Sequence, residues 1–507
     1  MKIIDTFIFY NEIDMLNLRL HELNEIVDYF ILVEADKTHS NNQKDFIFEK
    51  NKALFTNYLD KIIHIKVIDM PERNFTTNTG NWDREHYQRN QIKIGLNKLN
   101  LTDEDIIIMS DVDEIPNINT IKNYIKNNKI DGIYKLEMDF YYYNFENKII
   151  DTIWPSSRIF NYGSINNNDY INYLTNIRTI KDFNNNKIIK NGGWHLSYFL
   201  DIDLIINKIK QFAHQEYNTE KIINKTALEK LINTNKDIFY REPLKIKKTS
   251  HYLLWNQITQ NYLPNYYSMI MFPKLTYLTH LGFKYNTDKA WGHLFTEFYY
   301  NYFESFRYKK INILEIGIYL GSSLKMLKDF FPNAIIYSID INDEYINKNF
   351  GKNIKLFNCS QIDLIKFDNI FNNIKFDIII DDGSHQTLHQ LISLGHMFKY
   401  LNKNGLYVCE DLHTSLNKTY CNTTISTLDV LKQFQQTNKI YSNVISNENI
   451  NYLNNNIKLI DIYYKTQNHL KCYKCGKINF DNVNICECNS VLDYKNNPSI
   501  TSIIIHK

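Results

Sequence analysis

The chain has 507 residues, a length typical of two or three domains. Its formal net charge of +2 argues against a nucleic-acid partner, which would favour a strongly basic surface. No stretch reaches the ~18 uncharged apolar residues of a membrane helix, and residues 1–14 lack the cleavage region of a signal peptide, so a cytoplasmic protein without a membrane span is expected.

Short apolar runs alternate with helical patterns in the first part of the chain. Residues 13–24 and 84–100 have the spacing of amphipathic helices. Four apolar runs read as buried strands, at residues 2–11, 27–35, 61–68 and 105–111. This alternation predicts a mostly parallel sheet with helices on both faces.

A second alternation of the same kind begins after an irregular stretch, and we place a domain boundary at about residue 275. Five further runs read as strands, at residues 311–317, 334–341, 353–359, 376–383 and 405–412. The halves share a class but no internal repeat. The sequence therefore predicts two α/β domains, residues 1–275 and 276–507.

Acidic residues follow the fourth predicted strand, in the stretch SDVDEIP. Asp111, Asp113 and Glu114 lie so close that their charges repel, so a cation is expected beside them. The carboxyl end of a parallel strand is where open α/β sheets bind ligands. Asp111 and Asp113 are spaced to reach one hard cation, Mn²⁺ or Mg²⁺, that in turn holds a diphosphate. The alternative is a solvated turn whose acids cap a helix starting at about Ile118.

The surroundings of this stretch carry a family pattern. Five segments occur in one order: residues 5–40, HYQRN (86–90), SDVDEIP (110–116), GGWHLSYF (192–199) and KQFAHQEYN (210–218). Together they resemble glycosyltransferase family seventeen, the bisecting β-1,4-N-acetylglucosaminyltransferase-like enzymes, over about residues 3–275. The resemblance implies a nucleotide-diphospho-sugar transferase (GT-A-like) fold and inverting transfer of a sugar, N-acetylglucosamine, from a UDP-sugar donor to a glycan or glycoprotein acceptor.

Roles within that site follow from the resemblance and from chemistry. Asp111 and Asp113 would sit at the metal and the diphosphate. An inverting transfer needs a base for the acceptor hydroxyl, and Glu216 and Glu114 are both candidates, while His214 is catalytic or structural. The remaining assignments are Tyr10, Asn11 and Glu12 facing the nucleotide, Glu34 on uridine or ribose, and His195 as a further metal or phosphate ligand or as part of a tight turn.

The animal enzymes of that family carry an N-terminal membrane anchor, which this sequence lacks. Golgi residence is therefore not expected. The abundance of Asn, Ile and Lys is typical of an AT-rich coding genome. It would suit a large DNA virus or a protist.

A glycine-rich turn opens the second domain. In LEIGIYLGSSL (314–324), Gly317 and Gly321 let the backbone approach a ligand at a helix N-terminus, which favours negative charge. Glu315 precedes the first of these glycines, and Asp340 ends the next strand, where a ribose-binding acid belongs. The arrangement resembles a class I S-adenosylmethionine-dependent methyltransferase. A dinucleotide site and a plain α/β turn are the alternatives.

A second acid cluster follows two later strands. Asp381 and Asp382 end one strand, and Glu410 and Asp411 end the next. Carboxylates at the tips of adjacent parallel strands converge, and they suit an octahedral Mg²⁺ that holds vicinal oxygens of a substrate. His385 would take the proton from a hydroxyl, or is a helix-capping or core residue.

The motifs of the second half together carry a narrower resemblance. Residues 285–303, EIGIYLGSSL, DIIIDDGSHQ and GLYVCEDLHTS resemble macrolide-sugar O-methyltransferases of the macrocin type, over about residues 278–420 plus SITSIIIHK. This implies a Rossmann-like class I fold and metal-dependent O-methylation of a sugar hydroxyl. The metal would be held by Asp382, Glu410 and Asp411. S-adenosylmethionine would be surrounded by Glu315, Gly317, Ser322, Asp340, Gln361 and Asp363, with Asp288 and His293 in the entry segment.

Four cysteines near the C-terminus form a motif of their own. Cys472 and Cys475 give Cys-x2-Cys, and after ten residues Cys486 and Cys488 give Cys-x-Cys. Four thiolates predict a tetrahedral structural Zn²⁺ in a small insert at 472–489. The alternative is a β-hairpin with reduced free thiols.

The combined prediction is a bifunctional glycan-modifying enzyme that adds a sugar with one domain and O-methylates a sugar with the other. One rival is a single-activity methyltransferase whose N-terminal half is a glycan- or nucleotide-binding module. The other is a binding protein with two degenerate sites. Acceptor, linkage, methylated hydroxyl and oligomeric state are left open by the sequence.

Overall fold

The computed structural model divides into two compact units, Met1–Pro273 and Lys274–Lys507. It describes residues 1–72, 80–145, 147–166, 174–181, 187–234, 236–241, 244–248, 264–479 and 483–507. The division lies close to the expected boundary at residue 275. In these ranges no helix has both the length and the apolar character needed to cross a membrane.

Unit 1 alternates strands and helices through its first half and then turns richer in strands. Its strands are β1 (Ile3–Phe9), β2 (Tyr29–Ala35), β3 (Ile62–Val67), β4 (Ile106–Met109), β5 (Glu114–Pro116), β6 (Ile133–Tyr142), β7 (Asn147–Ile149), β8 (Trp154–Asn161), β9 (Ile188–Ser197) and β10 (Ile246–Lys248). Its helices are α1 (Ile13–Leu23), α2 (Ile47–Lys50), α3 (Gly80–Asn90), α4 (Ile92–Leu96), α5 (Ile118–Asn127), α6 (Gly163–Asn166), α7 (Leu174–Thr179), α8 (Ile202–Gln211), α9 (Lys225–Asn233) and α10 (Ser268–Met271), with 3₁₀ turns at Lys52–Tyr58 and Gln215–Tyr217. The four strands and the helices predicted before residue 111 are confirmed.

The sheet of unit 1 is mixed, not mostly parallel as predicted. Its order is β10-β7-β6-β8-β4-β1-β2-β3, and β9 pairs with both β5 and β6. The neighbours β4, β1, β2 and β3 run parallel, whereas β8 is antiparallel to both β4 and β6. The prediction failed beyond residue 111 because the long strands β6, β8 and β9 carry many polar residues and were not recognised.

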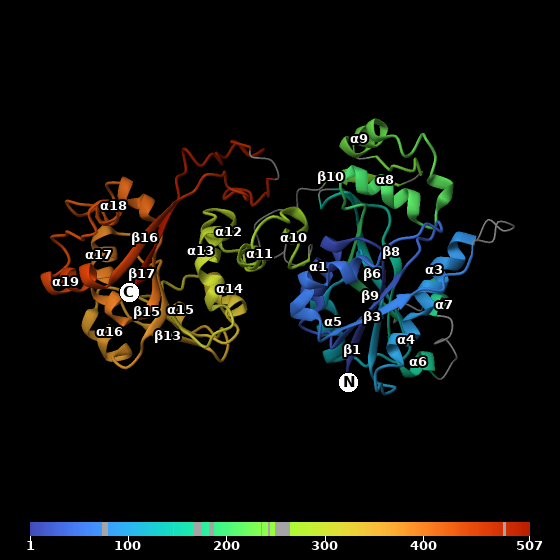
Figure 1. The fold of residues 1–507 in the computed structure, drawn as a ribbon, viewed down its shortest axis with the longest axis horizontal. Helices are drawn as coiled ribbons and strands as arrows, with labels where there is room; N and C mark the ends of the chain where they lie inside the picture. Colours follow the sequence, from blue (N-terminus) through green and yellow to red (C-terminus); the bar gives the residue numbers. More distant parts are fainter. Residues whose placement is uncertain are drawn as a thin grey trace. The chain divides into compact units, whose positions relative to one another are not determined.

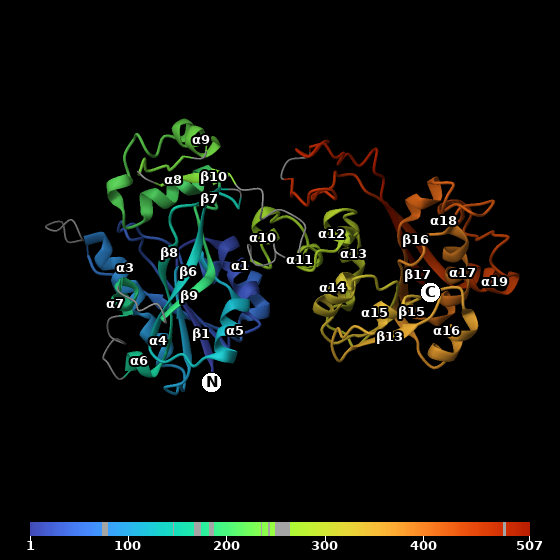
Figure 2. The same ribbon diagram turned by 180° about the vertical axis from the view of Figure 1, so that it is seen from behind.

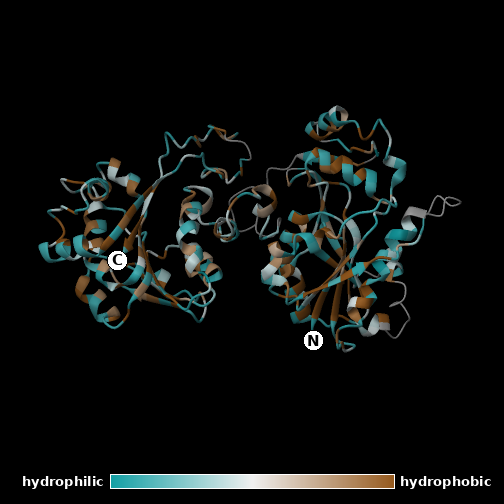
Figure 3. Cartoon of the chain, in the orientation of Figure 1, coloured by the Kyte–Doolittle hydropathy of each residue, from teal (hydrophilic) through white to brown (hydrophobic). Residues whose placement is uncertain are grey.

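Helices cover both faces of this sheet. Figures 1 and 2 show α1 and α5 on one face and α3, α4, α6 and α7 on the other. Each face has its own apolar core, one with Ile31, Ile107 and Leu174 and the other with Ile108 and Ile121. The alternation of side chains along β4 sends Ile107 and Ile108 to opposite cores. Figure 3 shows the resulting hydrophobic strands between more hydrophilic helix surfaces.

A buried arginine of α1 fixes the end of β4. Arg19 is 0% exposed and forms a bidentate pair with Asp5, at 2.7 Å from Nε to Oδ2 and 2.6 Å from Nη2 to Oδ1. Its Nη1 also donates to the main-chain oxygens of Asp111 at 2.8 Å and Glu114 at 2.7 Å. The loop after β4 therefore takes its shape from a cation in a helix 92 residues earlier.

Unit 2 begins with helices and continues as a second α/β alternation. Its strands are β11 (Asn312–Ile316), β12 (Ile335–Asp340), β13 (Ile354–Asn358), β14 (Phe376–Asp381), β15 (Leu401–Cys409), β16 (Ile457–Tyr464) and β17 (Ile500–His506). Its helices are α11 (Tyr277–Lys284), α12 (Asp288–Trp291), α13 (Phe295–Phe303), α14 (Ser322–Phe330), α15 (Asp343–Ile346), α16 (Leu364–Phe371), α17 (Thr387–Met397), α18 (Thr427–Thr437) and α19 (Asn447–Asn456), with 3₁₀ turns at Glu304–Phe306, Phe398–Tyr400 and Leu412–Leu416. All five strands predicted here are present.

The second sheet has the order β13-β12-β11-β14-β15-β17-β16. The first five strands of this order are parallel, and β17 is antiparallel to both β15 and β16. Such a doubly wound order places its switch point between β11 and β14, where ligands bind beyond the carboxyl ends of the strands. A large apolar core joins this sheet to α16, α17 and α18. The expected Rossmann-like fold is confirmed.

Removing the Arg19 cation should destabilise unit 1. Arg19→Met leaves Asp5 as a buried unpaired carboxylate, and we expect a loss of ~3–5 kcal/mol in unfolding free energy. The double variant Asp5→Asn/Arg19→Met should lose less, because no charge is then stranded. Chemical denaturation of the full chain measures both, and a double variant no more stable than the single one would contradict this account.

Candidate active sites

Unit 1 has a cavity of about 390 Å³ beyond the carboxyl ends of β1, β2 and β4. Tyr10 and Glu12 line it after β1, and Asp111 and Asp113 line it after β4. The remaining wall combines aromatic rings with cations, among them Phe140, Tyr142, Trp154, Tyr198, Lys37, Lys44, Arg178, Lys208 and Arg241. A cavity with apolar walls, cations and a few acids suits a ligand that has both a ring system and negative charge.

Asp111 is neutralised by two arginines. Its Oδ1 lies 2.8 Å from Nη1 of Arg89, and its Oδ2 accepts from Nη2 of Arg178 at 2.5 Å. Burial raises the pKa of Asp111, and these two guanidinium groups oppose that effect. The cation expected beside the acids is therefore supplied by the chain itself, and each oxygen of Asp111 faces one guanidinium group.

Glu114 is a buried structural acid. It accepts from Arg178 at 2.5 Å, from Trp154 Nε1 at 2.5 Å and from Ser157 Oγ at 2.7 Å. Burial opposes its ionisation, but Arg178 and these hydrogen bonds hold the pKa of Glu114 well below its usual range. Glu114 was one of the two candidates for the catalytic base. A carboxylate with so low a pKa is a weak base and does not suit that role.

Asp113 is the acid that fits a divalent cation. Its Oδ1 lies 3.7 Å from Nε2 of His195, and its Oδ2 accepts from Nζ of Lys208 at 3.2 Å. Burial lowers the pKa of His195, which keeps the imidazole neutral and able to act as a metal ligand. Lys208 also pairs with Glu12 at 3.1 Å. Side chains from the loops after β1 and β4, from β9 and from α8 thus meet at one point of the cavity wall.

Two predicted residues of this site lie elsewhere. Glu34 is 0% exposed, and its Oε1 accepts from Ile47 N at 2.5 Å and Lys44 Nζ at 3.0 Å, so it orders the start of α2 and does not face the cavity. Glu216 is exposed, pairs with His214 at 2.6 Å and is not among the cavity residues. Asn11 lies next to the cavity residues Tyr10 and Glu12 but does not line the cavity.

The predicted capping acids are also corrected. Helix α5 starts at Ile118 as the alternative required, but its cap is Asn117, whose side chain accepts from the main-chain nitrogens of Asn119 and Thr120. Of the acids before this helix, Asp111 and Asp113 line the cavity, and Asp111 and Glu114 pair with Arg178. The solvated-turn interpretation of this stretch is therefore wrong.

The glycine-rich turn of unit 2 adopts a backbone conformation that favours glycine at two positions. Gly317 and Gly321 have φ of 97° and 73°, which glycine adopts most readily. A Cβ on Gly317 would lie 2.4 Å from the main-chain oxygen of Asp382. Asp340 accepts from Ile318 N at 2.8 Å and so ties this turn to the end of β12. Ser322 is the first residue of α14, directly after the turn.

Three acidic or basic side chains gather beyond β14 and β15. Asp382, His385 and Asp411 each offer a ligand atom within 4.8 Å of the others, and this set fits a divalent cation. His385 and Asp411 have positive φ of 60° and 52°, a strained state for residues other than glycine. Thr414 Oγ1 donates to the main-chain oxygens of both, at 2.9 Å and 2.7 Å, and links the two loops.

Lys289 was not predicted as a site residue. It lies between three acids of unit 2, Asp382, Glu410 and Glu315. It is 3% exposed, its Nζ donates to Glu410 at 2.6 Å and to Asp382, and it lies 3.8 Å from Glu315. Burial raises the pKa of Glu315 to about 7, against the effect of Lys289. In the sequence, the position of Lys289 is marked by the neighbouring Asp288 in the stretch NTDKAWGH.

Three other predicted residues of unit 2 hydrogen-bond within the fold. Asp381, the last residue of β14, is buried and accepts from Gln361 Nε2 and Tyr407 Oη, both at 3.1 Å. Gln361 is itself buried and accepts from Ser384 N at 2.8 Å. Asp363 caps α16 by accepting from Lys366 N. Asp381 is therefore not among the side chains that gather around Asp382 in the described residues.

Comparison with known proteins gives one family and several relatives. The model of glycosyltransferase family 17 matches residues 1–286, more than half of the 507 residues. Mycinamicin VI 2''-O-methyltransferase of Micromonospora griseorubida is 35% identical over 148 residues, which cover 27% of this chain and 36% of that protein. Demethylmacrocin O-methyltransferase of Streptomyces fradiae is 36% identical over 148 residues, covering 27% of this chain and 37% of that protein.

The matches to these relatives span little more than a third of their length. Among solved structures, MycE methyltransferase in complex with Mg, SAH and mycinamycin VI is 17% identical and covers 75% of this chain and 84% of that one, with a TM-score of 0.34. A TM-score this low supports no inference about the fold, which rests on the strand order.

The acids around Lys289 should respond to a divalent cation. Lys289→Met leaves Asp382 and Glu410 without their partner, and we expect ~3–5 kcal/mol lower stability of unit 2. Millimolar Mg²⁺ should restore part of it, because the ion replaces the lost charge. Thermal unfolding with and without Mg²⁺ measures this, with Lys284→Met as control, since Lys284 pairs with the more exposed Asp329. An equal Mg²⁺ response in both variants would contradict the assignment.

Proposed function

Because the chain belongs to glycosyltransferase family 17, we propose that unit 1 transfers a sugar, N-acetylglucosamine, from a UDP-sugar to a hydroxyl of a glycan or glycoprotein on a GT-A-like fold. The observation that carries this proposal is the meeting of Asp113, His195 and Lys208 in one cavity wall at the carboxyl edge of the sheet. A site of this kind suits the diphosphate of a nucleotide sugar.

The chain's own residues would share the work of binding the donor. Lys208 would pair with the diphosphate, and the aromatic wall formed by residues such as Tyr10 and Trp154 would take the rings of the donor. Asp113 and His195 would hold Mn²⁺ or Mg²⁺, which when bound stabilises negative charge on the departing UDP. Asp111, paired with Arg89 and Arg178, would fix the loop that presents Asp113.

The donor site can be tested without knowing the acceptor. Full-length protein with Mn²⁺ should release UDP slowly from one member of a panel of UDP-sugars. Asp113→Asn should reduce this rate by ~10²-fold or more, because it removes a preorganised charge at the reacting group. Glu216→Gln is the matched control and should keep the rate, since Glu216 lies outside the cavity. Equal loss in both variants, or no loss in Asp113→Asn, would refute the assignment.

We further propose that unit 2 transfers a methyl group from S-adenosylmethionine to a sugar hydroxyl. Two relatives, at 33% and 35% identity, are O-methyltransferases whose names include a glycosyl group, rhamnosyl in one and olivosyl in the other. The group Asp382, His385 and Asp411 beyond β14 and β15 supports the proposal. Gly317, Gly321 and Asp340 would hold the methyl donor at the switch point of the sheet.

Each residue of this second site has a proposed role. His385 would accept the proton of the hydroxyl, and its Nδ1 lies 3.4 Å from Asp411, which would orient the ring. The hydroxyl oxygen would attack the methyl carbon, so that the C–S bond breaks and S-adenosylhomocysteine leaves. Asp382 and Asp411 would hold Mg²⁺, which when bound lowers the pKa of the hydroxyl. Lys289 would balance Glu410 and the remaining charge.

Methyl transfer gives the second functional test. With a panel of sugar acceptors and S-adenosylmethionine, wild-type protein should form S-adenosylhomocysteine in a Mg²⁺-dependent reaction. His385→Gln should lose ~10²–10⁴-fold in kcat while still binding S-adenosylmethionine, as expected for loss of a base. His389→Gln is the control, because His389 hydrogen-bonds Ser384 outside the acid group. A His385→Gln enzyme with wild-type kcat would rule out the role.

An alternative has one supporting observation. Both oxygens of Asp111 are taken by arginines, so unit 1 would serve as a glycan- or nucleotide-binding module beside an active methyltransferase. The UDP-release assay separates the two cases, since a binding module binds UDP without cleaving any UDP-sugar. If both units are active, they would act in succession on one glycan.

A further inference from the structure

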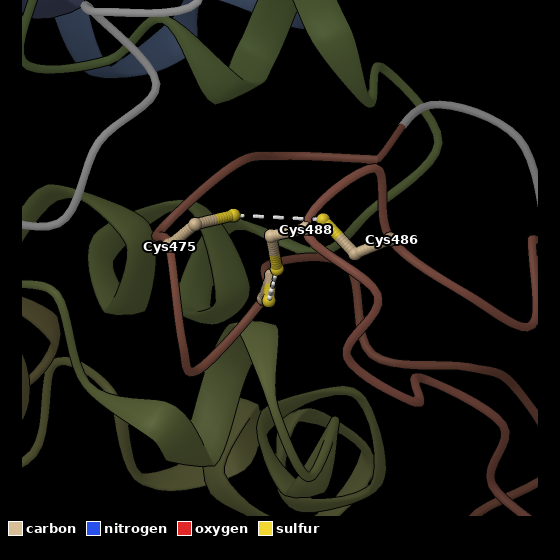
Figure 4. Close-up of side chains that lie close together, drawn as sticks. Cys475, Cys486 and Cys488 are labelled. Atoms are coloured by element: carbon tan, nitrogen blue, oxygen red, sulfur yellow. Dashed lines mark hydrogen bonds between the residues drawn. The ribbon is translucent and has the colours of Figure 1, made fainter.

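Four cysteines of unit 2 converge although they come from two separate hairpins. The first hairpin is closed by the bridge Lys471↔Ile478 and carries Cys472 and Cys475. The second is closed by Ile485↔Val491 and carries Cys486 and Cys488. Figure 4 shows the sulfurs of Cys475 and Cys486 directed toward each other, with the side chain of Cys488 close beside them.

The sulfur spacing is that of a metal site. All four Sγ atoms lie within 4.8 Å of one another, with Cys472 to Cys488 and Cys475 to Cys486 both at 3.5 Å. A tetrahedral Zn²⁺ with Zn–S bonds of about 2.3 Å holds its sulfurs ~3.8 Å apart. The chain thus brings its four thiols to nearly the separation that one zinc ion requires.

Few apolar side chains hold the two hairpins together. Among the described residues, the buried cluster around the sulfurs contains one residue other than cysteine, Leu492. Tight turns with positive φ at Gly476 (72°) and Asn489 (65°) bring each cysteine pair together. Small segments with so little apolar core are usually stabilised by a metal or by disulfides. Four mutually close thiols favour the metal.

The first hairpin also places a tyrosine against the entry segment of unit 2, which we define as residues 286–293. Tyr473 lies between Cys472 and Cys475, and its ring meets that of Trp291 edge-on at 4.8 Å. Its hydroxyl lies 3.4 Å from Nε2 of His293.

Hydrogen bonds from the main chain and from a lysine also join the first hairpin region to the entry segment. Leu470 N donates to the main-chain oxygen of Trp291 at 2.8 Å, and Lys471 Nζ donates to Asn286 at 2.7 Å. A Cβ on Gly292 would lie 2.8 Å from the Tyr473 hydroxyl, so a larger residue there would force the tyrosine side chain to shift. The entry segment in turn carries Lys289, whose Nζ donates to Glu410 at 2.6 Å.

We propose that Cys472, Cys475, Cys486 and Cys488 bind one structural Zn²⁺, and that this metal holds Tyr473 and the entry segment in place at the acids of unit 2. Tyr473 is a positioning residue, since it acts through His293 and Trp291. The coupling to catalysis rests on the proposed methyl transfer, whereas the metal site itself does not.

Metal content tests the site directly. Full-length protein purified without added metal should contain one zinc per chain by mass spectrometry of its metals, and Co²⁺ exchanged into it should show thiolate charge-transfer bands. Cys475→Ser should weaken Zn²⁺ binding by ~100-fold or more, since even outer-shell changes cost ~10–100-fold. Cys421→Ser is the matched control, because Cys421 lies outside the group and is also partly buried. Wild-type protein without metal, with four thiols that react freely, would overturn the proposal.

Hydrogen exchange tests the coupling in wild-type protein, independently of activity. Stripping zinc with a chelator should speed amide exchange in the entry segment by roughly tenfold or more, while the turn at Gly317 keeps its protection. Tyr473→Phe should retain zinc and S-adenosylmethionine binding but raise the KM for the acceptor. Unchanged exchange after zinc loss would overturn the coupling. A zinc-containing protein with coupled exchange but no methyl transfer to any acceptor would refute the proposed function and leave the metal site standing.

Discussion

Carboxylates at the carboxyl ends of strands, each paired with a cation from a distant part of the chain, are the constraint on which both sites depend. In unit 1, Arg19 and Arg178 hold the loop after β4, and Lys208 joins Asp113 to Glu12. In unit 2, Lys289 joins Glu410, Asp382 and Glu315. Buried acids without these partners would cost several kcal/mol each, so the cations make the acidic edges of the two sheets possible.

This pairing decides which acids remain available for a ligand. Each oxygen of Asp111 faces a guanidinium group, whereas Asp113 lies beside the neutral His195, so the proposed metal of unit 1 would be held by the second aspartate of the pair. In unit 2, Asp411 stays clear of Lys289 and approaches His385, and a metal there would compete with the lysine for Asp382.

The sequence predicted the apolar strands and the acids that follow them, because both are local signals. It could not predict the partners: Arg178 lies 67 residues from Asp111, and Lys289 lies 121 residues from Glu410. Adjacent acids were also treated alike, although Asp381 accepts from Gln361 and Tyr407 whereas Asp382 pairs with Lys289. Glu34 was placed at the nucleotide because it ends a strand, yet the segment that covers it belongs to α2. The polar strands β6, β8 and β9 lacked the apolar pattern that the prediction relied on.

The central claim is that one chain carries both a glycosyl-transfer site and a methyl-transfer site. The most direct test is mass spectrometry of a glycan acceptor pool after incubation with a UDP-sugar and deuterated S-adenosylmethionine. The account predicts products that carry both the added sugar and the labelled methyl group, with Asp113→Asn removing the first mass increment and His385→Gln the second. Labelled methyl groups without any sugar addition, at every donor tried, would contradict it.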